Sequence, residues 1–389
     1  MENRYLQTSV RKDLDDKKMV FIAGPRQVGK TTLAKQIQEA MGGGLYFSWD
    51  RREDRRKLLE AKWPAESTTI VLDELHKYPK WKRWIKGEYD LHKDKLRVIV
   101  TGSARLDVYR KGGDSLQGRY HHYRLHPFSL AVIGGIQPHL PIGKELDIPR
   151  EGNREVLDQL LRFSGFPEPM LAQSERTRRR WQKERLERFF REDVRDLENV
   201  RELAMLELLA DLLPGKVGSL LSINALREDL EVSHRAASHW IQILETLYFA
   251  FRVYPFAGKK VRSLKKEPKL YLWDWTLVEN PSARFENLVA SHLLKFCHYL
   301  EDVEGYSAEL FYLRNVAKKE VDFLVTVDRK PWFAVEVKVS AQDPAKELVY
   351  FGQRLSIPYL YQIHLNGDED YLKNGVRVAP AAKFLYALI

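Results

Sequence analysis

The sequence predicts an α/β protein that begins with a parallel sheet covered by helices and continues into a second α/β region. Short apolar runs at residues 19–23, 69–73 and 97–101 alternate with stretches of helical spacing. Such alternation is typical of a parallel sheet with helices on both faces. A glycine-rich loop follows the first run directly, and a β-hairpin pattern lies at residues 320–339. These three observations predict two sheets joined by a mainly helical segment.

Composition and charge indicate a large protein of a reducing compartment. A length of 389 residues favours two or three domains, and a net charge of +10 favours polyanionic partners. The single cysteine, Cys297, excludes an internal disulfide and a multi-cysteine zinc site. No apolar signal segment is seen, and no run reaches the roughly 18 apolar residues of a membrane span. We therefore expect a cytoplasmic protein without a membrane partner.

The loop after the first strand carries the complete phosphate-binding signature G-x-x-x-x-G-K-[ST]. Gly24 and Gly29 let backbone N–H groups point at phosphate, and Lys30 neutralises the terminal phosphates. The Thr31 hydroxyl can ligate Mg²⁺, and the next helix directs its positive end at the anion. We predict a P-loop NTPase sheet that binds ATP and Mg²⁺. The expected nucleotide contacts are Gly24, Pro25, Arg26, Gln27, Val28, Gly29, Lys30, Thr31 and Thr32.

Two later strands end in polar residues that suit the same site. The strand at 69–73 ends in Asp73 and Glu74, the Walker B pattern. Asp73 would hold Mg²⁺ through water, and Glu74 would polarise the attacking water. The strand at 97–101 is expected to carry a γ-phosphate sensor, either Thr101 or Ser103. Ligands of parallel sheets bind at the carboxyl ends of the strands, where these side chains lie.

The motifs resemble those of a large prokaryotic family of AAA-type P-loop ATPases with a C-terminal domain of formerly unknown function. The runs that carry the resemblance are LDELHKYPKW, VTGSARL and SLQGRYHHYRLHPFSL. The resemblance covers nearly the whole chain. It implies that Arg119, after Gly118, completes an ATP site in its own chain or in a neighbouring subunit of a homo-oligomer. The alternative is a surface arginine after a glycine turn.

The middle of the chain is predicted to be helical and basic. Residues 138–200 read as a linker and helical lid region, whose long helix at 175–198 carries cations at 176–183. Those cations either meet nucleic acid or face solvent. Residues 201–281 are predicted to hold a winged helix-turn-helix with a recognition helix at 234–247 and a cationic loop at 259–266. Winged helices also dock proteins, so a DNA contact and a protein contact both stay open.

Residues 282–389 combine a helical glutamate with a charged hairpin. Glu286 lies on an amphipathic helix, Asp322 opens one strand, and period-two spacing places Glu336 and Lys338 on one face of the other. This D…E-x-K pattern resembles the core of restriction-endonuclease-like nucleases. The resemblance implies that Glu286, Asp322 and Glu336 bind Mg²⁺ or Mn²⁺ and that Lys338 supports the attacking water. Glu320 is a rival ligand, and the alternatives are a salt-bridged strand pair or a nuclease fold without catalysis.

The expected order is therefore an AAA-type P-loop ATPase domain (1–137), a linker and helical lid (138–200), a winged-helix region (201–281) and a restriction-endonuclease-like α/β domain (282–389). The expected function is an ATP-hydrolysing protein acting on nucleic acid, DNA in the first place, with a metal-dependent nuclease controlled by ATP state. The alternative function is an ATP-driven switch whose C-terminal domain only binds DNA or a protein partner.

Overall fold

The chain folds as two compact units. The computed structural model describes residues 4–16, 18–64, 66, 68–102, 116–136, 140–194, 203–257 and 266–389. The first unit is formed by Asn3–His126 with Thr246–Tyr248, and the second by Pro127–Glu245 with Phe249–Ile389. In the described part of the chain, no helix has both the length and the apolar character needed to cross a membrane.

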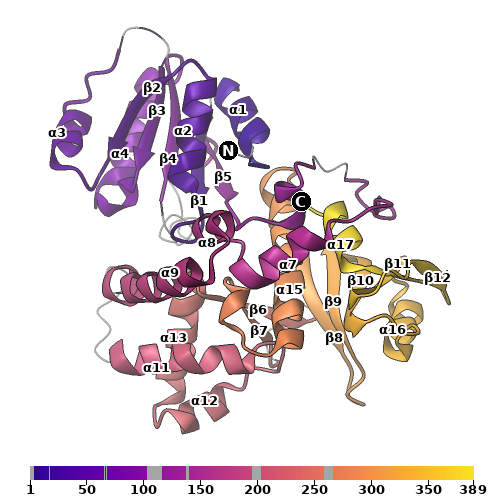
Figure 1. Ribbon diagram of the computed structural model, residues 1–389. Helices are drawn as coiled ribbons and strands as arrows, with labels where there is room; N and C mark the ends of the chain where they lie inside the picture. Colours follow the sequence, from indigo (N-terminus) through magenta and orange to yellow (C-terminus); the bar gives the residue numbers. More distant parts are fainter. Residues whose placement is uncertain are drawn as a thin grey trace. The chain divides into compact units, whose positions relative to one another are not determined.

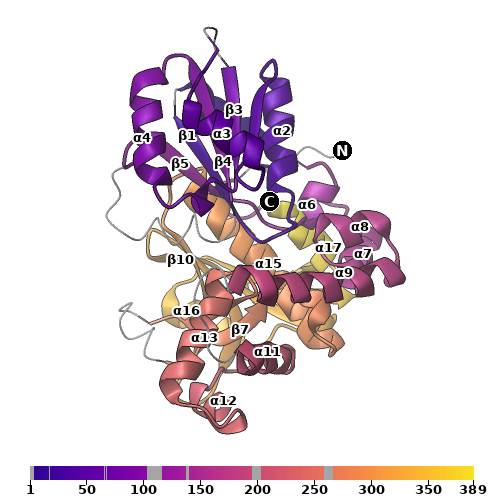
Figure 2. The same cartoon turned by 90° about the vertical axis from the view of Figure 1, so that its left-hand side faces the viewer.

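The first unit is built on a five-stranded sheet in which every neighbouring pair of strands is parallel. The strand order is β2 (Gly44–Ser48), β3 (Thr68–Asp73), β4 (Leu96–Thr101), β1 (Met19–Ala23) and β5 (Tyr120–Arg124). Its main helices are α1 (Gln7–Asp15), α2 (Lys30–Ala40), α3 (Arg52–Glu60) and α4 (Trp81–His92). Figure 2 shows α2 and α4 on opposite sides of this sheet. The predicted parallel sheet flanked by helices is confirmed.

Alternating side chains of the central strands form the core of this sheet. Phe21 of β1 packs with Trp81 of α4, at a ring-centroid distance of 5.7 Å. All five residues of β1 are buried, as expected for a strand covered on both faces. Strand β4 lies between β1 and β3, so Ile99 is paired with both Val20 and Val71. The carboxyl ends of β1, β3 and β4 therefore meet at one edge.

The second unit begins with a series of helices. They are α6 (Leu130–Ile133), α7 (Arg154–Phe163), α8 (Pro167–Ala172), α9 (Glu175–Arg188), α11 (Leu203–Leu212), α12 (Ile223–Asp229) and α13 (His234–Thr246). Ser174 caps α9 by accepting the N–H of Thr177. A π-helical turn, Phe189–Val194, follows α9, and the predicted end of this helix at residue 198 lies outside the described residues.

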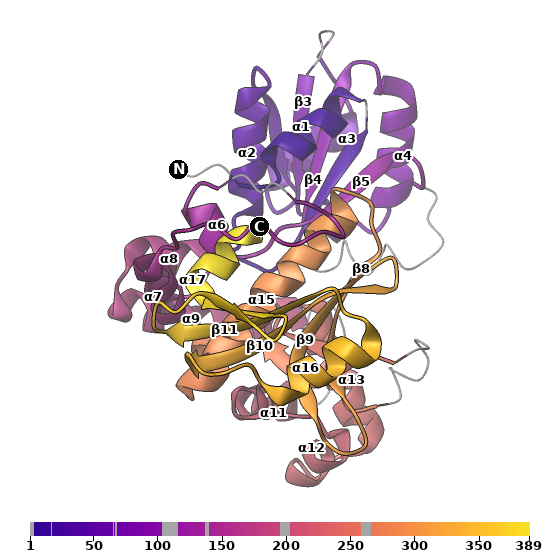
Figure 3. The same cartoon turned by 90° about the vertical axis from the view of Figure 1, so that its right-hand side faces the viewer.

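An eight-stranded sheet forms the rest of the second unit. Its order is β12 (Tyr371–Lys373), β13 (Val376–Pro380), β11 (Tyr359–Asn366), β10 (Lys330–Ser340), β9 (Glu320–Val327), β8 (Ala308–Arg314), β6 (Ala250–Pro255) and β7 (Lys269–Leu272). Helix α15 (Pro281–Asp302) packs Phe296 against Phe333 of β10. Helix α16 (Lys346–Leu355) packs with the adjacent residue, Ala334, so the two helices cover opposite faces (Figure 3). The prediction that a later sheet follows the P-loop sheet is confirmed.

The two strands on either side of the predicted cationic loop, β6 and β7, belong to this same sheet. Strands β6 and β7 are antiparallel to each other, and β6 also pairs in parallel with β8 through Tyr254 and Phe311. One sheet therefore crosses residue 281, where the sequence analysis expected a domain border. Of the predicted cationic loop, only Lys266 lies among the described residues, and it is exposed.

Candidate functional site

The phosphate loop lies between β1 and α2, as its signature requires. Gly24 has φ 145° and Gly29 has φ 98°, both in the left-handed region that favours glycine. A Cβ atom on Gly24 would lie 2.4 Å from the carbonyl oxygen of Leu125, so no other residue fits there without displacing backbone. Gly29 directly precedes the first residue of α2. The loop is therefore held in a bent form that side chains at these two positions would oppose.

Lys30 is buried within this loop. Its Nζ donates to the carbonyl oxygens of Gly24 and Pro25, at 2.9 and 2.8 Å. The loop thus curls around an ammonium group. Phosphate oxygens are stronger acceptors for an ammonium than carbonyl oxygens are, because they are charged. The arrangement fits an anion that replaces these two acceptors.

Three hydroxyl groups hold the carboxylate of Asp73 at the carboxyl edge of the sheet. Oδ2 accepts from Thr31 Oγ1 at 3.1 Å and from the Tyr46 hydroxyl at 2.7 Å. Oδ1 accepts from Thr101 Oγ1. The structure therefore brings together Thr31, Asp73 and Thr101, which the sequence analysis assigned to one site. Ser103, the other sensor candidate, lies outside the described residues.

Tyr46 is a member of this group that sequence reasoning missed. It lies on β2, and burial, followed by its hydrogen bond to Asp73, raises the pKa of its hydroxyl well above the usual range. The Nζ of Lys35 lies 4.1 Å from the centroid of its ring. The only sequence signal was a tyrosine in the strand that pairs with the Walker B strand.

Glu74 has a strained backbone and cationic neighbours. Its φ is 56°, and its N–H donates to the carbonyl oxygen of Thr101 at 2.9 Å. Its carboxylate lies 3.5 Å from His76 Nε2 and 3.7 Å from Lys77 Nζ. Burial raises the pKa of the Glu74 carboxyl, against the opposing effects of Lys30 and Lys77. Glu74 is thus near Lys30 and positioned by residues that the sequence analysis did not assign.

Arg119 lies elsewhere on the sheet. Its guanidinium contacts Asp90 of α4 through Nε at 2.8 Å and Nη2 at 3.1 Å. Its carbonyl oxygen accepts the N–H of Met19, the first residue of β1, whereas the phosphate loop follows the last residue of β1. The two ends of a five-residue strand are about 13 Å apart. The structure therefore does not bring Arg119 to the phosphate loop of its own chain.

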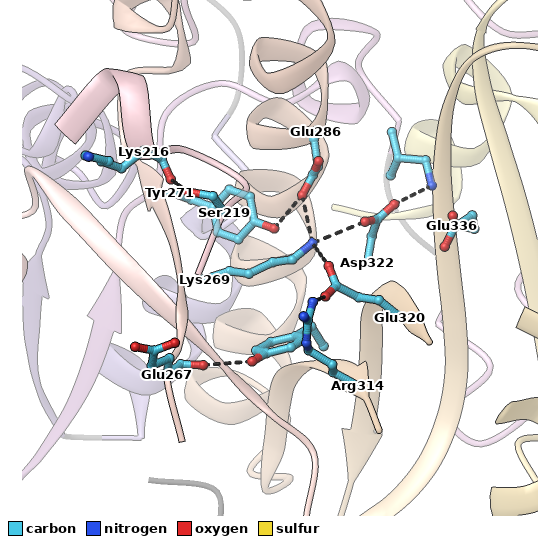
Figure 4. A network of polar contacts seen from close by, with 12 residues as sticks. Lys216, Ser219, Glu267, Lys269, Tyr271, Glu286, Arg314, Glu320, Asp322 and Glu336 are labelled. Atoms are coloured by element: carbon cyan, nitrogen blue, oxygen red, sulfur yellow. Dashed lines mark hydrogen bonds and ion pairs between the residues drawn. The ribbon is translucent and has the colours of Figure 1, made fainter. Parts of the chain in front are cut away.

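In the second unit, Lys269 lies among three carboxylates (Figure 4). Its Nζ is 3.4 Å from Glu286 Oε1, 2.8 Å from Glu320 Oε1 and 3.3 Å from Asp322 Oδ1. Burial alone would lower the pKa of Lys269, but Asp322, Glu286 and Glu320 together raise it well above the usual range. No sequence motif pointed to this lysine, which is the first residue of β7.

The predicted nuclease residues have further partners of their own. Glu286 Oε1 accepts the Tyr271 hydroxyl at 2.7 Å, and Asp322 Oδ2 accepts the N–H of Val337 at 3.0 Å. Lys338 Nζ pairs with Glu336 Oε1 at 2.7 Å, while the buried Oε2 of Glu336 has no hydrogen-bond partner. Burial, followed by repulsion from Asp322, raises the pKa of both Glu286 and Glu336 to about 7.

These side chains do not fit a divalent metal as they stand. Among the residues that the structure describes, no three His, Cys, Asp or Glu side chains are grouped so that they could hold a metal ion. The carboxylates of Glu286 and Asp322 instead share the ammonium of Lys269. Glu320, weighed as a rival ligand, pairs with both Lys269 and Arg314.

Comparison with known families covers most of the chain in three segments. Residues 16–133 match an AAA domain. Residues 154–283 match a domain of unknown function (DUF8612), and residues 282–384 match another (DUF4143). The glycine-rich loop, Asp73, Glu74 and the sheet of the first unit all fall within the first segment.

Similar proteins align with this chain over most of its length. The uncharacterized protein MJ1544 of Methanocaldococcus jannaschii is 22% identical over 384 residues, which cover 92% of this chain and 84% of that protein. The uncharacterized protein Rv2008c of Mycobacterium tuberculosis is 21% identical over 347 residues, which cover 87% of this chain and 74% of that protein.

Among solved structures, the RuvB Holliday junction branch migration motor of Thermotoga maritima is 18% identical. It has a TM-score of 0.29 and covers 67% of this chain and 95% of that chain. This structural similarity is too low to assign a fold. The fold of the first unit is assigned from the family match and from the geometry of the loop and sheet. Together they show that the first unit has an AAA-type P-loop ATPase fold.

Proposed function

We propose that this protein is an ATP-driven switch that hydrolyses ATP in its first unit and acts on nucleic acid. The observation that carries the proposal is the group formed by Lys30, Thr31, Asp73 and Thr101 at one edge of the sheet. Lys30 would exchange its two carbonyl acceptors for phosphate oxygens. Thr31 and Asp73 would hold Mg²⁺, which neutralises charge on the phosphates when bound. Glu74 would orient and polarise the attacking water.

Two substitutions test this assignment. We expect Lys30→Ala to abolish tight nucleotide binding, because it removes the cation inside the loop. We expect Glu74→Gln to keep nucleotide binding and to lower ATP turnover by about 10²-fold or more, because Mg²⁺ ligation survives and water polarisation does not. Binding is measured with a fluorescent ATP analogue and turnover by phosphate release.

The matched controls are Lys57→Ala and Glu53→Gln. Both side chains are exposed on α3, and each control makes the same chemical change as its test variant. Both controls should bind and hydrolyse ATP like the wild type. Equal turnover by the wild type and Glu74→Gln would remove Glu74 from the proposed role.

The proposed action on nucleic acid is supported by two exposed faces of the second unit. Helix α9 presents four exposed cations between residues 176 and 183, and helix α13 presents three exposed basic or imidazole side chains. They are Arg176, Arg179, Arg180 and Lys183 on α9, and His234, Arg235 and His239 on α13. The formal charge of +10 agrees with a polyanionic partner.

In this proposal the C-terminal sheet binds its partner without cleaving it. The pairing of Lys269 with Glu286 and Asp322 favours this role over a metal-dependent nuclease controlled by ATP. The test incubates purified protein with DNA and RNA, with and without ATP, in Mg²⁺ or Mn²⁺. We expect no cleavage above that of a mock preparation. Cleavage that disappears in Asp322→Asn would establish the nuclease instead.

A further inference from the structure

The carboxylate cluster of the C-terminal sheet contains its own cation. Three of its acidic side chains come from two elements: Glu286 from α15, and Glu320 and Asp322 from β9. The ammonium of Lys269 reaches all three from β7 (Figure 4). We infer that Lys269 is the permanent cation of this cluster, in the position that a divalent metal would need, and that the cluster joins strands instead of cleaving phosphodiesters.

Burial keeps the ammonium in place. The Lys269 side chain is 3% exposed, and its Nζ lies 5.8 Å from the centroid of the Tyr312 ring. Its backbone is paired with Val253 of β6 and bridged to Leu220. Backbone pairing on both sides fixes the Cα of Lys269, and the burial of its side chain favours the ammonium in contact with the carboxylates. Its departure would also leave the largely buried carboxylates of Glu286 and Asp322 without their paired cation.

The charges nearly balance without a metal. The four carboxylates Glu286, Glu320, Asp322 and Glu336 face three cations. Lys269 contacts the first three, Arg314 contacts Glu320, and Lys338 contacts Glu336. The net charge of the cluster is therefore slightly negative, and a bound divalent ion would make it positive.

One oxygen of Glu286 and both oxygens of Asp322 are also engaged. Glu286 Oε1 accepts from Tyr271 as well as from Lys269, and Asp322 uses its second oxygen for the N–H of Val337. Mg²⁺ requires near-octahedral oxygen ligands at about 2.1 Å, which an ammonium directed at the same oxygens excludes by space and by repulsion. The Oε2 atom of Glu336 is buried and has no hydrogen-bond partner. Among the described residues it is the only oxygen of the three predicted ligands, Glu286, Asp322 and Glu336, that is both buried and unpartnered.

Lys269 and its partners come from different parts of the chain. Lys269 lies in the segment 154–283, and the carboxylates lie in the segment 282–384, which match separate families. Lys269 precedes Glu286 by 17 residues and Asp322 by 53. The cluster therefore attaches the β6–β7 pair to α15 and β9, and so makes one sheet of elements contributed by both segments.

The deciding experiment titrates nucleotide-free wild-type protein with Mn²⁺ and follows binding by calorimetry and unfolding by melting temperature. We expect no Mn²⁺ binding at the cluster. We also expect any effect of Mn²⁺ on the melting temperature to be the same in the wild type and in Asp322→Asn. We expect Asp322→Asn to lower the melting temperature, because it removes a counter-charge of Lys269. Metal binding by the wild type that is lost in Asp322→Asn would overturn the inference, whatever other variants do.

A second variant asks whether removing the ammonium creates the metal site. Lys269→Met keeps the apolar stem and removes the charge, so the carboxylates repel one another and the melting temperature in EDTA should fall. Mn²⁺ should then raise it by about 3 °C or more, because a ligand that binds only the folded state stabilises it. Lys266→Met, an exposed lysine three residues earlier, is the matched control and should show neither change. A folded Lys269→Met protein without a Mn²⁺ response would contradict the inference.

The inference rests on the non-cleaving role proposed for the C-terminal sheet and is separable from the proposed ATP hydrolysis. Lys269 and the phosphate loop belong to different compact units. ATP turnover measured on the same preparations therefore tests the first unit alone, and the Mn²⁺ titrations test the second.

Discussion

His292 shows how one buried side chain links the stability of the second unit to pH. Its Nε2 accepts the N–H of Leu130 at 3.1 Å, and its Nδ1 lies 2.8 Å from the carbonyl oxygen of Leu288, which requires a proton on Nδ1. Complete burial lowers its pKa to about 3, and the nearby charge of Lys295 adds to the decrease. The imidazole is therefore neutral in the folded protein over the physiological range.

This pKa predicts a loss of stability in mild acid. The unfolded chain takes up a proton near pH 6.5 and the folded chain only near pH 3, so the stabilisation is complete above pH 6.5 and decreases as the pH falls. The wild type should lose about 1.4 kcal/mol of unfolding free energy per pH unit from this group, whereas His292→Gln, which keeps an acceptor for Leu130, should not. Urea unfolding between about pH 6.5 and 5 measures the difference. Parallel profiles for the two proteins would contradict the assignment.

At the scale of an element, α9 divides its cations between two environments. Arg185 is buried, with its guanidinium carbon 4.2 Å from the centroid of the Phe166 ring, and burial lowers its pKa. Trp181 is buried on the same face. The other face carries the exposed cations proposed to contact phosphate. One basic helix thus has a packed side that supports the fold and a charged side available to a partner.

Reversing charges on the exposed side should weaken nucleic-acid binding and its dependence on salt. Each lost phosphate contact lowers the slope of log affinity against log salt by about 0.9, because fewer counterions are released. The variant changes Arg176, Arg179 and Lys183 to glutamate. Fluorescence anisotropy with labelled DNA over a salt series measures the slope.

The matched control makes the same change of charge on α3, in the other unit. It replaces Arg52, Arg55 and Lys57, which are exposed and lie outside the proposed contact face. Its salt slope should stay closer to that of the wild type. An equal loss in both variants would mean that net charge, and not the α9 face, governs binding.

At the scale of the whole molecule, the place of Arg119 bears on assembly. The arginine pairs with Asp90 at the amino edge of the first sheet, and the phosphate loop lies at the carboxyl edge. A short parallel strand separates the two edges within one chain. Any contact of Arg119 with ATP therefore has to come from a neighbouring copy of the chain.

A mixing experiment tests that arrangement. Arg119→Ala and Lys30→Ala should each lower ATP turnover, and mixing them should restore part of it, because a subunit with an intact loop meets a neighbour with an intact arginine. The control Asp90→Asn removes the ion pair but keeps the guanidinium of Arg119. Comparing it with Arg119→Ala shows which of the two losses lowers ATP turnover. Light scattering that finds a monomer with ATP bound would exclude the arrangement and leave Arg119 as a surface ion pair.

The sequence by itself determined the edge of the first sheet at which we propose that ATP binds, because the residues that form it are encoded locally. The loop from Gly24 to Thr31 is contiguous, and Asp73 and Thr101 each end a strand, so the parallel sheet brings them together. The tertiary structure decided what depends on pairing between distant segments. Tyr46 reaches Asp73 only because β2 lies beside β3, and β6 joins the second sheet only because it pairs with β8. Lys269 enters a cluster formed by Glu286 and Asp322 for the same reason: local residue patterns carry no information about which remote charge will be buried beside them.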